Sequence, residues 1–199
     1  MYRFFNSFSS LIIIFTFILI FSLCFFIPIF SQYGYISPLQ INSNSSCLKI
    51  STSNFAWPTP GYTTITSKFG YRTSPTSGAG TYHGGIDIAA PTGSNIIASY
   101  SGRVSFTGFS GAGGFTVTIK TDNLAISYSH VSPNFLVYVG QFVKQGDIIA
   151  KVGPKNVYGV LNNPYKDSNG NPTNGATTGP HLHFSIKKDG KAVNPLDYF

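Results

Sequence analysis

After residue 55, no segment of the sequence has apolar residues recurring at intervals of three and four over the length of a helix. Short runs of alternating apolar and polar residues occur instead, bounded by glycine, proline or asparagine. This pattern predicts strands that bury one face and are joined by tight turns. The expected fold of residues 55–199 is therefore mainly β, with antiparallel, sandwich-like sheets.

The same runs predict which strands pair. We expect residues 96–99 to pair with 103–106, residues 115–119 with 124–128, residues 147–152 to form a single strand, and residues 181–187 to pair with 192–193. Asp189-Gly190 separates the last two runs, and Asp-Gly between alternating runs is a strong hairpin signal. The domain is thus expected to end on an antiparallel hairpin.

Residues 11–30 form an uncharged run dominated by isoleucine, leucine and phenylalanine. A helix of this length, at about 1.5 Å per residue, spans a bilayer. We expect a single-pass transmembrane signal anchor here, with residues 1–10 in the cytoplasm because Arg3 precedes the run. The cytoplasmic membrane is then a partner of the chain, and the domain lies outside it. A cleaved signal peptide, which would give a secreted protein, is the alternative.

Residues 31–54 are rich in serine, asparagine and glutamine. This composition is typical of a linker, so we expect a polar linker between the membrane segment and a domain at 55–199.

The charged residues limit the classes of function. The chain carries a formal net charge of +7, and its six acidic residues are all aspartate. Without glutamate it cannot contain the His-Glu-x-x-His motif of one class of zinc peptidases. Its lysines and arginines are scattered along the sequence, so nucleic-acid binding is not expected.

The four histidines of the chain all lie in short, distinctive contexts. His181 and His183 stand two residues apart in an expected strand, so their side chains project from the same face. His83 precedes Asp87 by four residues, and His130 is the fourth histidine. Catalytic zinc typically has three protein ligands and a water molecule, and imidazole transfers protons near neutral pH. Two histidines and one carboxylate would suit the metal, and the other histidines would suit proton transfer.

Three motifs carry a resemblance to a known family. They are His83-x-x-x-Asp87, Tyr128-x-His130 and His181-x-His183, and their flanking residues 65–72 and 178–184 agree as well. In this order they resemble the motifs of the lysostaphin-like zinc endopeptidases of family M23, the LytM-type peptidases of bacterial cell walls. The resemblance extends from about Trp57 to Tyr198.

The resemblance implies a lysostaphin-type peptidase domain that binds Zn²⁺ through His83, Asp87 and His183. His130 and His181 would be the catalytic pair beside the metal, acting on a zinc-bound water. The implied activity is hydrolysis of peptide bonds in the stem or cross-bridge peptides of bacterial peptidoglycan. The bond that is cut and the oligomeric state are not specified by the sequence.

Two segments are candidate walls for a substrate groove, namely Gly111–Gly114 and the polar insertion 153–180. Arg72 is either a surface charge or a substrate contact. The alternative function is a catalytically latent protein of the same fold that binds the cell wall or activates another hydrolase. All five site positions are filled, which favours the enzyme.

Overall fold

The computed structural model describes residues 55–199, and within them the chain forms twelve short strands, two 3₁₀ helices and no α-helix. The elements are β1 (Ile65–Ser67), β2 (Gly70–Tyr71), β3 (Tyr82–His83), β4 (Ile86–Ala89), β5 (Asn95–Ile97), β6 (Gly102–Phe109), η1 (Gly111–Gly113), β7 (Phe115–Lys120), β8 (Leu124–Ser129), β9 (Phe142–Val143), β10 (Ile148–Lys151), β11 (His181–Lys188), β12 (Lys191–Val193) and η2 (Pro195–Tyr198). The expectation of a mainly β fold is confirmed.

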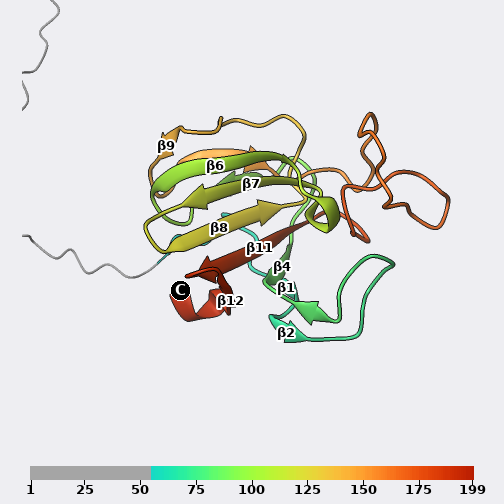
Figure 1. Ribbon diagram of the computed structural model, residues 1–199, viewed down its shortest axis with the longest axis horizontal. Coiled ribbons are helices and arrows are strands. Elements are labelled where there is room, and N and C mark those ends of the chain that lie inside the picture. Colours follow the sequence, from blue (N-terminus) through green and yellow to red (C-terminus); the bar gives the residue numbers. More distant parts are fainter. Residues whose placement is uncertain (1–54) are drawn as a thin grey trace, which may run out of the picture. The chain divides into compact units, whose positions relative to one another are not determined.

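Eight strands form the main sheet, in the order β1-β4-β11-β8-β7-β6-β9, with β12 also paired to β11 (Figure 1). Every strand pair is antiparallel. Strand β11 has β8 along one edge, and β4 and β12 share its other edge. The strand that carries two of the histidines is therefore held on both sides.

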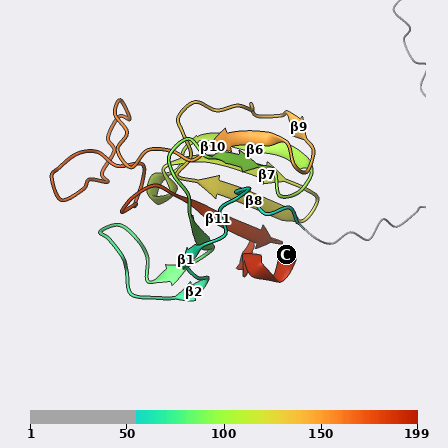
Figure 2. The same ribbon diagram turned by 180° about the vertical axis from the view of Figure 1, so that it is seen from behind.

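The alternation of β11 separates its two faces. Leu182, Phe184 and Ile186 are 0% exposed and lie in the hydrophobic core, whereas the intervening residues are partly exposed. The small sheet of β5 and β10 contributes Ile96 and Ile149 to the same core cluster as the main sheet. The two sheets thus bury one shared core (Figure 2).

One expected strand pair is wrong. The chain from 95 to 97 does not pair with the following strand: β5 pairs with β10, and β6 pairs with β7 and β9. Ala98 donates its N–H to Asp147 and accepts from Gly146, so hydrogen bonds to a distant segment direct the chain from one sheet to the other. The pairing of 115–119 with 124–128 and the final hairpin are both confirmed.

The expected membrane segment at 11–30 and the linker at 31–54 lie outside the described residues. Between residues 55 and 199, no helix has the length and apolar character needed to cross a bilayer.

Replacing Ile186 by alanine tests the contribution of β11 to the core. Ile186 is fully buried, so Ile186→Ala should lower the free energy of unfolding by about 2–5 kcal/mol. Urea denaturation measures the loss. Lys188→Ala, on the exposed end of the same strand, is the control and should change stability little. An equal effect of the two substitutions would contradict the assignment of the buried face.

Candidate metal centre

The pairing of β4 with β11 positions two of the candidate ligands. Asp87 lies directly opposite His183 in this antiparallel register. Gly85 permits the close approach, because a Cβ atom there would lie 2.3 Å from the carbonyl oxygen of Phe184. His83 reaches the same point from β3, just before the two glycines that lead into β4.

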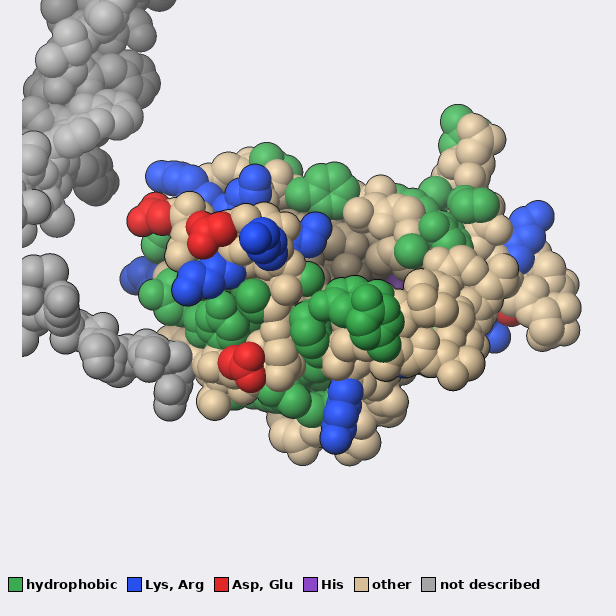
Figure 3. All heavy atoms as spheres, turned by 60° about the horizontal axis from the view of Figure 1, so that its bottom comes forward, with side chains coloured by type: hydrophobic (Ala, Val, Ile, Leu, Met, Phe, Trp, Pro, Cys, Tyr) green, Lys and Arg blue, Asp and Glu red, His purple; other side chains and the backbone are tan. Residues whose placement is uncertain are grey.

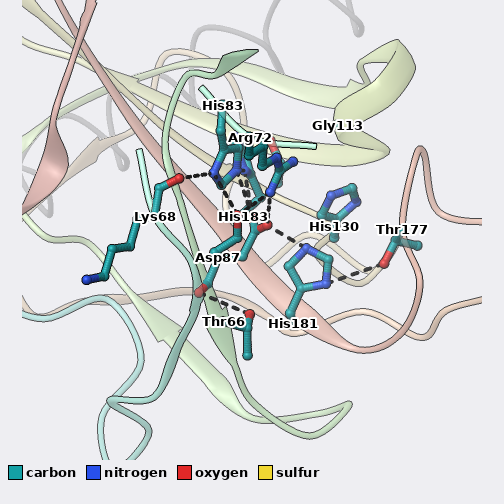
Figure 4. A network of polar contacts seen from close by, with 12 residues as sticks. Thr66, Lys68, Arg72, His83, Asp87, Gly113, His130, Thr177, His181 and His183 are labelled. Atoms are coloured by element: carbon teal, nitrogen blue, oxygen red, sulfur yellow. Dashed lines mark hydrogen bonds and ion pairs between the residues drawn. The ribbon is translucent and has the colours of Figure 1, made fainter. Parts of the chain in front are cut away.

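Three side-chain atoms of these residues converge. The Nε2 atom of His83 lies 3.1 Å from Oδ1 of Asp87 and 2.9 Å from Nδ1 of His183, and that Nδ1 lies 2.8 Å from the same Oδ1 (Figure 4). Such a cluster of nitrogen and oxygen donors can hold a metal ion. Two imidazoles and one carboxylate are a ligand set that zinc accepts while keeping a position open.

A backbone carbonyl fixes the tautomer of His83. Its Nδ1 atom lies 2.8 Å from the carbonyl oxygen of Lys68. A carbonyl only accepts hydrogen bonds, so Nδ1 carries the proton and Nε2 presents its lone pair to the cluster. Ligand histidines of metal sites are typically oriented by such a second hydrogen bond.

Arg72 holds the other oxygen of the carboxylate. Its guanidinium donates to Oδ2 of Asp87 at 3.0 Å and also donates to the hydroxyl of Ser67. Arg72 therefore contacts a candidate ligand, whereas the sequence left open a surface charge or a substrate contact.

The pKa of Asp87 is well below its usual range. Burial alone would raise it, but in acid, where the carboxyl would titrate, protonated imidazoles outweigh that effect through hydrogen bonds from His183 and His83 and the charges of His183 and His181. Asp87 is thus a carboxylate under all ordinary conditions, as a metal ligand must be.

The other two histidines lie beside this cluster. The Nε2 atom of His181 is 3.6 Å from Oδ1 of Asp87, and the rings of His130 and His181 are 4.6 Å apart between centroids. His181 donates from Nδ1 to the carbonyl of Gly179 at 2.9 Å, which leaves its Nε2 as an acceptor. Burial lowers the pKa of His181 below its ordinary value despite the nearby carboxylate of Asp87.

His130 is held in an uncommon backbone conformation, with φ of 58°. Residues with positive φ other than glycine often mark functional positions. Its N–H donates to Gly113, and its carbonyl accepts from Gly153. Burial, with the neighbouring charges of His181 and His183, lowers its pKa to about 3, so the ring is neutral at pH 7.

Asn174, from the 153–180 insertion, orients this ring. Its backbone carbonyl oxygen accepts a hydrogen bond from Nδ1 of His130 at 2.6 Å. Its fully buried side chain accepts from the N–H of Phe115 and donates to the carbonyl of Val131. This residue was not predicted from the sequence, because a single asparagine in a polar loop gives no signal of a buried role.

A cavity of about 640 Å³ opens over the cluster. The two expected walls both line it, through Ala112 and Gly113 on one side and Ala176, Thr178, Gly179 and Pro180 on the other. A third wall comes from residues between Arg72 and Gly84, a segment that was not predicted to be a wall. Tyr128 does not line the cavity: it is buried in the core, where its hydroxyl accepts from the N–H of Ser99 and burial raises its pKa to about 12.

The fold and this site agree with the family comparison. The model of "Peptidase family M23" matches residues 81–195, a stretch that contains all four histidines and Asp87. The chain belongs to peptidase family M23, a family of metallopeptidases.

Two curated relatives cover most of the chain. The DD-carboxypeptidase/endopeptidase Mpg of Neisseria meningitidis serogroup B is 35% identical over 136 residues, which are 68% of this chain and 27% of Mpg. The murein hydrolase activator NlpD of Escherichia coli is 34% identical over 148 residues, 73% of this chain and 31% of NlpD. The chain thus spans about a third or less of the length of these relatives.

Two solved structures are similar to the described domain. A zinc-containing peptidase from Vibrio cholerae superposes with a TM-score of 0.55 at 28% identity, over 71% of this chain and 39% of that one. The catalytic domain of lysostaphin from Staphylococcus simulans gives a TM-score of 0.53 at 24% identity, over 68% of this chain and 90% of that one. The second similarity shows a shared fold and confirms the expected lysostaphin-type domain.

The buried, neutral state of His130 predicts a pH dependence for the metal-free chain. The pKa of His130 is about 3 in the folded state and 6.5 without the fold, so the unfolded state binds more protons between these values. The free energy of unfolding should therefore fall as the pH drops below 6.5, with about 2 kcal/mol of the loss at pH 5 due to this group.

Urea denaturation at pH 7 and pH 5 measures this loss. His130→Asn, which keeps a residue that tolerates positive φ, should lose less stability between the two pH values than the wild type. Identical losses in both proteins would show that another group titrates.

Proposed function

We propose that this protein is a zinc-dependent endopeptidase that hydrolyses peptide bonds in the stem or cross-bridge peptides of bacterial peptidoglycan. The observation that carries the proposal is the meeting of three donor atoms within 3.1 Å of one another, with two further histidines beside them, at the base of one cavity. The zinc-containing relative and the endopeptidase named among the curated relatives support it.

His83, Asp87 and His183 would hold the zinc ion through Nε2, Oδ1 and Nδ1. When bound, zinc polarises the scissile carbonyl and lowers the pKa of a coordinated water molecule to about 7. Hydrogen bonds to the carbonyl of Lys68 and from Arg72 keep two of the ligands in the required orientation.

His181 is the proposed proton carrier. Its Nε2 lies 3.6 Å from Oδ1 of Asp87 and carries a lone pair when the ring is neutral. It would accept a proton as the water oxygen bonds to the peptide carbonyl carbon, and return the proton to the nitrogen atom as the C–N bond breaks. His130, neutral and held by Asn174, would accept a hydrogen bond from the reacting groups through its Nε2.

The cavity walls are consistent with a peptide substrate. Many of the wall residues are glycine, alanine or threonine, which leave room for a backbone in extended form. We propose that the domain lies outside the cytoplasmic membrane, held there by residues 11–30, because peptidoglycan is found on that side.

Histidine variants of the full-length chain separate metal binding from turnover. His83→Ala and His183→Ala should each abolish zinc binding, because each removes a ligand. His181→Ala should keep zinc and reduce turnover by about 100-fold or more. Bound zinc is measured by elemental mass spectrometry, and cleavage by the new amino termini released from purified peptidoglycan.

The outcomes of this experiment are distinct. Loss of zinc in His181→Ala would show that the ligand assignment is wrong. Folded wild-type protein without zinc would contradict the proposal. Zinc without cleavage would instead favour a latent protein that activates another hydrolase, in line with the name of the relative NlpD.

The contact between Arg72 and Asp87 predicts a lower zinc affinity when the guanidinium is removed. Arg72→Met should weaken zinc binding by about 10- to 100-fold, because the carboxylate loses the donor that orients it. Competition with a chromophoric chelator measures the affinity. Arg103→Met is the control, since that arginine contacts the carbonyl of Gly140 and does not line the cavity. Unchanged affinity in Arg72→Met would show that the carboxylate is oriented without it.

A further inference from the structure

Three aromatic side chains pack together beside the cavity, and one of them, Tyr82, lines it. Tyr71 of β2 pairs directly with Tyr82 of β3, and their rings are 5.1 Å apart at 73°. Phe69 also packs edge-on against Tyr82, at 5.6 Å and 77°, and is itself packed on the core. We call Phe69, Tyr71 and Tyr82 the aromatic corner.

The corner faces solvent to an unusual degree. Tyr71 is 89% exposed and Tyr82 is 46% exposed. Neither hydroxyl has a hydrogen-bond partner within residues 55–199. A cross-strand aromatic pair stabilises a hairpin, but that role does not require the outer ring to stand free in water. An exposed, rigid aromatic surface is typical of an interaction site.

The aromatic corner is continuous with the cavity. Tyr82 lines the cavity beside His83, and Arg72, Thr73 and Gly80 from the intervening loop line it too. Figure 3 shows hydrophobic side chains gathered next to a hollow in which a histidine reaches the surface. A substrate held in the cavity that extends past this wall therefore meets the corner.

The chemistry of the aromatic corner indicates which class of ligand it would bind. All three side chains are neutral, one ring face stands at a steep angle to the next, and two hydroxyls are available. A sugar ring offers apolar C–H faces that stack on aromatic rings, and hydroxyl groups that bond to phenols. The stem peptides of peptidoglycan are short and are attached to such sugars, so a cavity that holds the peptide has the glycan strand close by.

We infer that the aromatic corner binds a sugar ring of the glycan strand that carries the peptide. The inference rests on the proposed function for the peptide part of the substrate. The protein then recognises a glycan-linked peptide in preference to the same peptide alone.

Two soluble substrates test this preference. One is a stem peptide attached to its disaccharide, and the other is the same peptide without sugar. The wild-type chain should have the higher kcat/KM on the first. Tyr71→Ala should reduce this preference by about tenfold, the effect expected when one stacked ring contact is lost. Tyr71→Phe, which keeps the ring, should retain most of it.

A matched control excludes a general effect of removing a surface tyrosine. Tyr138 is 70% exposed and does not line the cavity, so Tyr138→Ala should leave the preference unchanged. Equal zinc content in all variants shows that the centre is intact. A wild type without preference, or a preference that survives Tyr71→Ala, would overturn the inference.

Direct binding separates this inference from the proposed function. A linear oligomer of N-acetylglucosamine, added to the full-length chain, should bind with lower affinity to Tyr71→Ala than to Tyr138→Ala or the wild type, as measured by calorimetry. Binding that depends on Tyr71 in a chain that cleaves neither substrate would refute the peptidase proposal and retain the sugar site. Cleavage with equal sugar affinity in all variants, or with no sugar binding, would refute the sugar site alone.

Discussion

The antiparallel register of β4 and β11 is the constraint on which the site depends. Asp87 faces His183 across this pair, and Leu182, Phe184 and Ile186 bury the opposite face of β11. Because side chains alternate along a strand, a slip of one residue would turn both histidines of β11 into the core. The apolar residues between and beyond the histidines therefore fix the positions of the histidines. The register that packs the core is also the register that forms the site.

Backbone carbonyls fix the orientation of three of the four histidine rings. His83, His130 and His181 each donate from Nδ1 to a main-chain oxygen, of Lys68, Asn174 and Gly179 respectively. Each ring thus turns its Nε2 atom, which carries a lone pair, toward the cavity. Since carbonyls do not titrate, these orientations persist over a wide pH range, and no separate acidic residue is needed behind each histidine.

Local patterns in the sequence predicted several of the longer strands and the motifs whose residues His83, Asp87 and His183 the fold brings together, because alternation, an Asp-Gly turn and short motifs are properties of neighbouring residues. The short strands β1 to β4 and β9 were not predicted. The pairing of β5 with β10 could not be predicted, because it joins segments about fifty residues apart that differ little from other alternating runs. The contact of Arg72 with Asp87 and that of Asn174 with His130 depend on how loops fold over the sheet. No local pattern encodes such contacts, so the structure was needed to assign these two residues.

The attachment of the insertion at Asn174 divides it into two parts with different freedom to change. From Asn174 to Pro180 the chain is bonded to the strand ends or lines the cavity, so its length is fixed. Residues 166–170 bond mainly among themselves and to the rest of the insertion, and none of them lines the cavity, whereas Tyr165 packs close to Gly78 of the third wall. This outer part is a permissive position: a peptide tag or a small binding module inserted there would be displayed beside the cavity without displacing its walls.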